Sequence, residues 1–172
     1  MRRQDSTRGG SGDVLAYFIS FRCHGTWLHG DERGSMDRTK HNIRGGDVIP
    51  PDKRRQDRES EQCKHPPVSL NRECRNIVAQ TIREVCDQRG WFLQALSVQK
   101  DHVHLVVTAD REPELVMTSL KTWSTRGLRA TGLMNPKIKP WSRHGSTRWL
   151  WTENEVHEAC VYVDEGQAEP PE

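Results

Sequence analysis

The chain has 172 residues, 33% of them hydrophobic, and its 26 Lys and Arg nearly balance 24 Asp and Glu, leaving a formal net charge of +2. This size suits one domain with polar extensions. So small a net charge does not indicate a bulk electrostatic attraction to nucleic acid, although it leaves room for a local basic surface. Without an apolar run near membrane-span length or a signal-like N-terminus, we expect a cytoplasmic protein with no membrane partner.

We expect a disordered tail over residues 1–13, a single domain over residues 14–167 and a short tail over residues 168–172. The domain begins with a long strand, residues 14–28, which is rich in aromatic and β-branched residues. Residues 30–68 then form a long polar insert with almost no apolar periodicity. A connection of this length is either functional or disordered. The five cysteines form no CxxC pair, which favours reduced thiols.

Helical spacing returns in residues 69–90, where Ser69 can cap the start and Gly90 follows the end. One apolar stripe runs along this helix: Leu70, Cys74, Ile77, Val78, Ile82 and Val85. Residues 91–101 and 102–110 then predict two adjacent strands, joined tightly near Lys100 and Asp101.

A second helix opens at Pro113 and carries Val116, Leu120 and Trp123 on one side. A short strand follows over residues 146–151. The last element is a helix over residues 152–166, at whose start Thr152 and Glu155 fit a T-x-x-E capping box. Its packing stripe contains Val156, Ala159, Cys160 and Val163.

The order of these elements predicts an α+β fold. The split βαβ pattern of a ferredoxin-like antiparallel sheet has the same order, which here is strand, helix, strand, strand, helix, strand and a terminal helix. Two helices would cover one face of this sheet. The opposite face would then be free for a ligand or a partner.

The stretch "DHVHLVV" places two histidines in an otherwise apolar strand. Side chains alternate between the faces of a strand, so Val103, Leu105 and Val107 would point at the helices and His102 and His104 at the other face. Two imidazoles side by side could ligate one divalent metal ion. A solvated histidine pair on an exposed face explains the spacing equally well.

Tyr162 lies about a quarter turn off the packing stripe of the terminal helix, on the same side as Glu155 and Glu158. A tyrosine on a helix flank is usually an amphipathic edge residue. The functional alternative is a nucleophile, which would need help from a metal-polarised electrophile or a nearby base.

These segments together resemble a known family. "DHVHLVV", a helix, and a last helix with "YVDEGQ" look like the single-tyrosine, insertion-sequence-200-like transposases of the HUH nuclease superfamily, whose kin include REP-associated tyrosine transposases. The stretches "FISFRCHGTWLHGDERGS" and "GSTRWLW" agree with a bacterial subgroup of this family. The resemblance covers residues 14–167, including the order of the elements.

The resemblance implies a DNA transposase with a ferredoxin-like fold that nicks and rejoins single-stranded DNA. Two histidines, here His102 and His104, and a Gln-type side chain would hold Mg or Mn, and Tyr162 would form a 5′-phosphotyrosine intermediate without ATP. Family members resembling this chain place Gln four residues after the tyrosine, where this chain has Gly166. We favour Gln167 as the third ligand, with Glu165 as the alternative.

The family binds single-stranded hairpin ends as a dimer, so we expect DNA hairpins and a second copy of the chain as partners. Expected phosphate contacts are Lys100, Lys121, Arg126 and Arg148, with Arg22 as a further candidate. Whether the tyrosine serves its own site or the partner's stays open. An alternative is a domesticated or inactive single-stranded nucleic-acid-binding protein of the same fold. A second alternative is an unrelated metal-binding domain in which the tyrosine is only structural.

Overall fold

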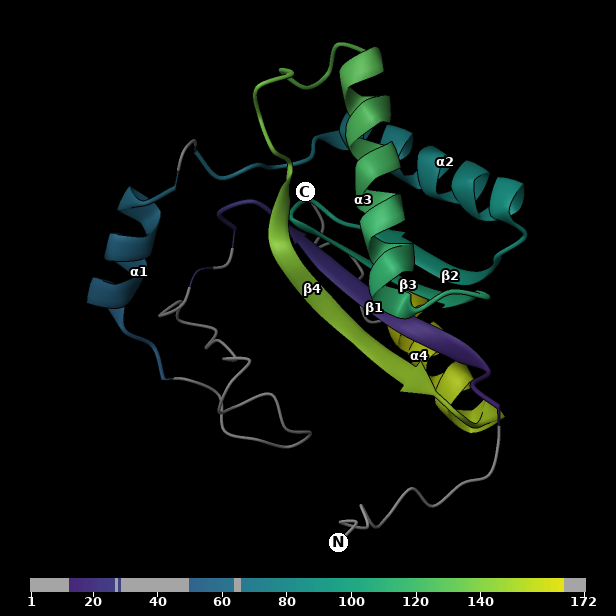
Figure 1. Ribbon diagram of the computed structural model, residues 1–172. Coiled ribbons are helices and arrows are strands. Elements are labelled where there is room, and N and C mark those ends of the chain that lie inside the picture. The colour runs from purple at the N-terminus through teal and green to yellow at the C-terminus, as the bar shows by residue number, and fades with distance from the viewer. Residues whose placement is uncertain (1–12, 27, 29–49, 64–65, 166–172) are drawn as a thin grey trace, which may run out of the picture.

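The computed structural model describes residues 13–26, 28, 50–63 and 66–165 (Figure 1). The strands are β1 (Ala16–Cys23), β2 (Phe92–Val98), β3 (His102–Thr108) and β4 (Trp141–Leu150). The helices are α1 (Lys53–Glu61), α2 (Arg72–Arg89), α3 (Pro113–Ala130) and α4 (Glu153–Glu165). Three predicted segments lie wholly or largely outside the described residues. They are the tail expected over residues 1–13, the tail over residues 168–172 and more than half of the insert expected over residues 30–68.

The four strands form one antiparallel sheet in the order β2-β3-β1-β4. With α1 set aside, this order and the sequence of strands and helices are those of the split βαβ fold, so the predicted fold is confirmed. The central pair β1 and β3 places Ser20 opposite His104 and Arg22 opposite His102. Opposed residues of an antiparallel pair project to the same face. Both pairs therefore share one face of the sheet.

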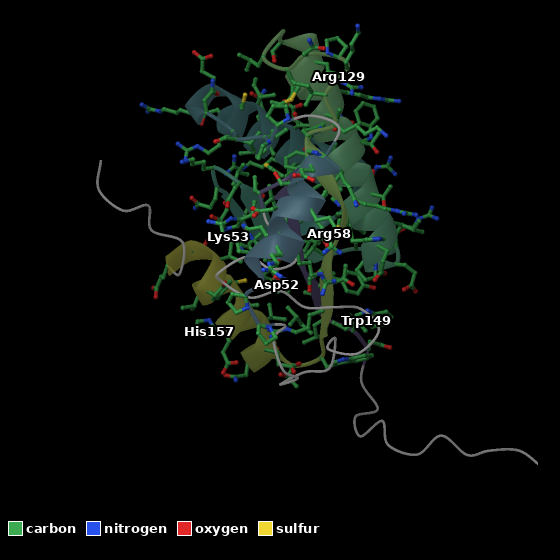
Figure 2. All side chains as sticks on the ribbon, turned by 90° about the vertical axis from the view of Figure 1, so that its left-hand side faces the viewer. Asp52, Lys53, Arg58, Arg129, Trp149 and His157 are labelled. Carbon is green, nitrogen blue, oxygen red and sulfur yellow. The ribbon has the colours of Figure 1, made fainter. Side chains whose placement is uncertain are left out.

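Helices lie on both faces of the sheet. Helices α2 and α3 cover one face and α4 lies on the other (Figure 1). Figure 2 looks toward the edge strand β4 and shows α3 and α4 on opposite sides of it. On the α2 and α3 side, Ile19, Val103 and Leu105 are fully buried in the larger core.

The face expected to be free is in part covered by α4. A smaller core there joins the sheet to the helix and contains Ala16, Ala95, Val106, Leu150, Ala159 and Val163. The physical reason is that β3 carries apolar residues on both of its faces, and on the histidine face Val106 is 0% exposed. The apolar stripe of α4 is removed from water against this surface. The prediction of a free opposite face is therefore wrong over this part of the sheet.

Two strands differ most in extent from the prediction, and one helix was not predicted. Strand β1 ends at Cys23 because the chain turns at Gly25, whose φ of 72° is left-handed. Strand β4 begins five residues earlier than predicted, since its pairing with β1 continues to Trp141. Helix α1 lies within the insert and was not predicted, because it buries no residue and so has no apolar periodicity. Its start is capped by Asp52, whose carboxylate accepts from the Arg55 amide at 3.2 Å.

Helix caps explain most of the remaining boundaries. Helix α2 is capped by Asn71, whose Oδ1 accepts from the Cys74 amide at 2.8 Å, so the prediction of Ser69 as the cap is wrong. Gly90 closes the same helix in the left-handed conformation, as predicted. The capping box of α4 is confirmed, since the Glu155 amide donates to the Thr152 hydroxyl at 3.2 Å and the Glu155 carboxylate accepts from the Thr152 amide at 3.2 Å.

The packing side of α3 was predicted in part. Val116 and Leu120 are fully buried, as expected. Trp123 is 39% exposed and does not join them. Ser124 and Leu128 occupy the buried side instead, because the helical period carries the stripe from Leu120 to positions four and eight residues later.

The state of the cysteines agrees with the expectation of reduced thiols. All five cysteines are free thiols. Burial raises the pKa of the Cys23 thiol to about 12 and that of Cys86 to about 11, so neither forms a reactive thiolate near neutral pH. In the described ranges, no helix has the length and apolar character needed to cross a membrane.

Gly145 of β4 is tightly packed from the α3 side. A Cβ atom there would lie against Met117 Sδ and 2.5 Å from the Ser20 carbonyl oxygen, which belongs to the backbone of β1. We expect Gly145→Ala to lower the free energy of unfolding by about 1–3 kcal/mol in urea denaturation, because the core is overpacked. Ser146→Ala, next to it on the opposite, exposed face, is the control and should change stability by no more than about 0.5 kcal/mol. A Gly145→Ala variant as stable as the parent would contradict this packing.

Candidate active site

The two histidines of β3 lie side by side on the face of the sheet that α4 shares. Their ring centroids are 4.7 Å apart, with an angle of 64° between the ring planes. His104 is 8% exposed, whereas His102, at the start of the strand, is half-buried. Val103 between them is fully buried on the opposite face, as alternation predicted. One strand therefore presents two imidazoles on the same side of the sheet.

Each imidazole is held through its Nδ1 atom. Asp101 Oδ1 lies 2.6 Å from His102 Nδ1, and Ser20 Oγ lies 2.5 Å from His104 Nδ1. Asp101 ends the β2–β3 turn, and Ser20 is the residue of β1 directly opposite His104. The fold therefore holds both rings through Nδ1, so a metal ion bound by these rings would have to be bound at Nε2.

Tyr162 of α4 completes a cluster with the histidines in the same chain. Its ring centroid lies 5.7 Å from that of His104, at an interplanar angle of 74°. The residue is 50% exposed, although Val163 beside it is buried. Helix α4 thus anchors its apolar stripe on the sheet and holds the phenol at the edge of the contact, next to the imidazoles. Strand β3 and helix α4, which are far apart in the sequence, therefore meet at this cluster.

Phe18 is the residue of this cluster that the sequence analysis missed. Its ring stacks on His104 at a centroid distance of 5.6 Å and an angle of 12°, and meets Tyr162 edge-on at 5.9 Å. Alternation from Ile19, a core residue of the other face, could have placed Phe18 on the histidine face. Without a known position for α4, however, nothing in the sequence linked Phe18 to the tyrosine.

The third ligand stays a prediction. Gln167 lies outside the described residues. Glu165 is the last residue of α4 and is exposed. Within the ranges that the structure describes, no group of three His, Cys, Asp or Glu side chains is arranged to hold a metal ion. Glu165 therefore does not complete such a group with the two histidines.

Three of the basic residues named from the sequence lie near the histidines. Arg148 of β4 is opposite Phe18, and its guanidinium carbon lies 5.6 Å from the centroid of that ring. Arg22 is opposite His102 on β1. Lys100 is exposed in the β2–β3 turn, two residues before His102. Arg22 and Arg148 therefore lie on the face that carries the cluster, and Lys100 lies in the turn that leads to it.

The two basic residues named on α3 lie on the other side of the sheet. Lys121 donates from Nζ to the carbonyl oxygens of Ser142 and His144 at 3.0 and 3.1 Å, and burial lowers its pKa to about 8. This lysine fastens α3 to β4. Arg126 is exposed and lies over the ring of Trp123 at 4.8 Å. The structure does not bring either residue together with the histidines.

The environment of His104 favours a neutral imidazole. Burial, the neighbouring His102 and the positive charge of Arg22 lower the pKa of His104 to about 4, with Asp101 opposing them. A histidine of ordinary pKa, about 6.5, would be partly protonated near neutral pH. His104 instead keeps a ring-nitrogen lone pair, which is the form that binds a metal ion.

We expect the imidazole of His104 to titrate with a midpoint near pH 4 in the metal-free protein. Because the folded chain binds this proton less tightly than the unfolded chain, the contribution of His104 to stability is complete above about pH 6.5 and is lost as the pH falls toward 4. Ring-proton and ring-nitrogen shifts measured by NMR, assigned with a His104→Gln variant, give the midpoint. A midpoint near 6.5 would contradict the burial described here.

Comparison with solved structures agrees with this fold. The structure of a REP-associated tyrosine transposase bound to a REP hairpin is similar over 94% of this chain and 70% of that chain, with 12% sequence identity and a TM-score of 0.50. A proposed transposase from Deinococcus radiodurans is 17% identical over 96% of this chain and 100% of that chain, with a TM-score of 0.49. The comparison with curated proteins finds no match.

The sequence itself matches a family. Residues 63–154, more than half of the chain, match the family described as IS200-like transposases. The matched segment includes both histidines and ends before Tyr162, so the place of the tyrosine beside them is an observation independent of the match. The chain belongs to the IS200-like transposase family.

Proposed function

We propose that this chain is a transposase that nicks and rejoins single-stranded DNA with Tyr162 as the nucleophile. The observation that supports this most is the contact of Tyr162 with His104 at 5.7 Å between ring centroids, made within one chain from two distant elements. An amphipathic edge residue would not require imidazoles beside its phenol. The relative bound to a REP hairpin supports hairpin DNA as the substrate class.

The reaction follows from the chemistry of a phenol and a phosphodiester. The Tyr162 oxygen attacks the phosphorus, the bond to the 3′ oxygen breaks, and the products are a 5′-phosphotyrosine and a free 3′-hydroxyl. The phenolic proton passes to solvent, which reaches the half-exposed side chain, and the leaving 3′ oxygen takes a proton from solvent. A DNA 3′-hydroxyl later attacks the same phosphorus, displaces the tyrosine and restores a phosphodiester. The bond is exchanged at each step, so no nucleotide cofactor is required.

The histidine pair fits a divalent metal ion such as Mg or Mn. Both rings are engaged at Nδ1, and the neutral His104 leaves Nε2 able to act as a ligand. We propose His102 and His104 as two ligands, with Gln167 as the third. When bound, the metal supplies a Lewis acid that polarises the scissile phosphate. Because described residues of a single chain form the cluster, we infer that the tyrosine serves its own histidines. A homodimer and a cytoplasmic location stay predictions.

The tyrosine and the histidines are tested by the covalent adduct that they would form. The protein is incubated with Mn²⁺ and a labelled library of single-stranded hairpins with randomised flanks, and protein–DNA adducts are separated on denaturing gels. We expect adducts with the parent chain and none with Tyr162→Phe. With His104→Ala we expect at least roughly a hundredfold fewer adducts, since removal of one electrostatic group from an active site generally lowers the reaction rate by this factor.

Tyr17→Phe is the matched control, because the chain has only two tyrosines and Tyr17 is buried in the core. This variant should form adducts at the parental level. Adducts that persist in Tyr162→Phe would contradict the assignment of the nucleophile. Hairpin binding with no adduct in any variant would support the alternative of an inactive DNA-binding protein.

The position of Arg148 on the cluster face predicts a direct contact with DNA phosphate. We expect Arg148→Ala to weaken hairpin binding roughly tenfold and to reduce the slope of log affinity against log salt by about 0.7, as for the loss of one phosphate contact to a single strand. Arg126→Ala is the matched control, because Arg126 is also an exposed arginine over an aromatic ring but lies on α3. Equal losses in both variants would contradict the choice of face.

A further inference from the structure

The contacts of Asp101 with His102 and of Ser20 with His104 bear on which ring nitrogen can bind a metal ion. A histidine can bind a metal through Nδ1 or Nε2, and the choice is set by the hydrogen bond of the other nitrogen. Here Asp101 and Ser20 occupy the Nδ1 positions at 2.6 and 2.5 Å. A metal–nitrogen bond is about 2.1 Å long, so a metal ion cannot also occupy either Nδ1 position. A metal ion bound by these two rings would therefore be bound at Nε2.

Asp101 determines which nitrogen of His102 carries the proton. An ionised carboxylate only accepts hydrogen bonds, so His102 Nδ1 must be the donor and Nε2 carries the lone pair in the neutral ring. The backbone of Asp101 is fixed as well, because its carbonyl oxygen accepts from the Cys23 amide at 2.8 Å and from the Thr26 hydroxyl at 3.4 Å. The end of β1 thereby holds the carboxylate in place behind the ring.

Ser20 contacts Nδ1 of His104 as Asp101 contacts Nδ1 of His102, but through a hydroxyl in place of a carboxylate. It is paired with His104 across the central strands, so the distance between the two side chains is set by the β1–β3 register. A hydroxyl can accept the Nδ1 proton and donate its own proton elsewhere. On the other side of the same imidazole, the Phe18 ring stacks at 12°. His104 is therefore held both in its ring plane and against rotation.

We propose that Asp101 and Ser20 are positioning residues that hold His102 and His104 in the Nδ1–H tautomer, with both Nε2 atoms directed to one shared divalent cation. The metal part of this inference rests on the proposed function. For His102 the tautomer part does not, because the Asp101 carboxylate can only accept the Nδ1 proton. For His104 the tautomer part does rest on it, because the Ser20 hydroxyl can donate or accept, and a metal ion at Nε2 requires the proton at Nδ1. Loss of such an outer partner generally weakens metal binding by roughly 10- to 100-fold.

The first test reads the tautomers directly in the metal-free protein. Long-range proton–nitrogen NMR spectra distinguish protonated from bare ring nitrogens. We expect a protonated Nδ1 in both histidines of the parent chain, a tautomer mixture for His104 alone in Ser20→Ala, and one for His102 alone in Asp101→Ala. Ser20→Thr keeps the hydroxyl and should keep the parental spectrum.

The second test measures Mn²⁺ affinity by titration calorimetry and by the EPR signal of free Mn²⁺. We expect Ser20→Ala and Asp101→Ala to bind roughly 10- to 100-fold more weakly and Ser20→Thr to stay within about threefold of the parent. Ser146→Ala is the matched control. Ser146 lies opposite Ser20 on the same face, on the β4 side away from His104, and its loss should leave the affinity unchanged.

The outcomes separate this inference from the proposed function. A parent chain that binds no Mn²⁺ would contradict the metal site, while the NMR spectra would still support or overturn the positioning role. A parent chain that binds Mn²⁺, with unchanged spectra and affinity in both alanine variants, would overturn the positioning role and leave the metal site intact. Because Asp101→Ala could also disturb the turn, Asp101→Asn is measured beside it. This variant keeps the acceptor oxygen without the charge, and it should retain the Nδ1–H tautomer with a smaller loss of affinity.

Discussion

The packing of α4 on the sheet is the interaction on which the candidate site depends. Val106 and Leu150 of the sheet are 0% exposed, and Val163 of the helix is 1% exposed. Each buried aliphatic side chain of this size contributes about 1.5–3 kcal/mol. Since Val163 directly follows Tyr162, burial of this apolar stripe fixes the phenol beside His104 and Phe18. The same face is therefore apolar where it binds the helix and polar where it carries the imidazoles.

The relation of sequence to structure was clearest where a local pattern has one structural solution. Alternation in "DHVHLVV" assigned both histidines to one face, and the box of Thr152 and Glu155 marked the start of α4. The sequence could not show on which face of the sheet α4 packs. An amphipathic pattern shows which side of a helix is apolar, but not which surface that side contacts. For this reason Phe18 was missed. Helix α1 was missed because it has no apolar side to detect. The third ligand falls beyond the described end of α4.

Family membership and site geometry support the proposed chemistry from different directions. The family match covers residues 63–154 and so includes the histidines but not the tyrosine. The fold then places the tyrosine with the histidines inside one chain. The buried, neutral His104, the hydrogen bonds at both Nδ1 atoms and the half-exposed phenol are compatible with the proposed metal-assisted attack on phosphate. Arg148 and Arg22 lie on the same face, where they would supply positive charge for the proposed phosphate contacts.

The central claim is that His102, His104 and Tyr162 of one chain form a single metal-assisted site. The most direct measurement is anomalous diffraction from crystals of the protein grown with Mn²⁺. We expect one anomalous peak at bonding distance from Nε2 of both histidines, on the side that faces Tyr162 of the same chain. A peak at an Nδ1 atom, a peak at a site away from the pair, or a tyrosine supplied by a second chain would contradict it.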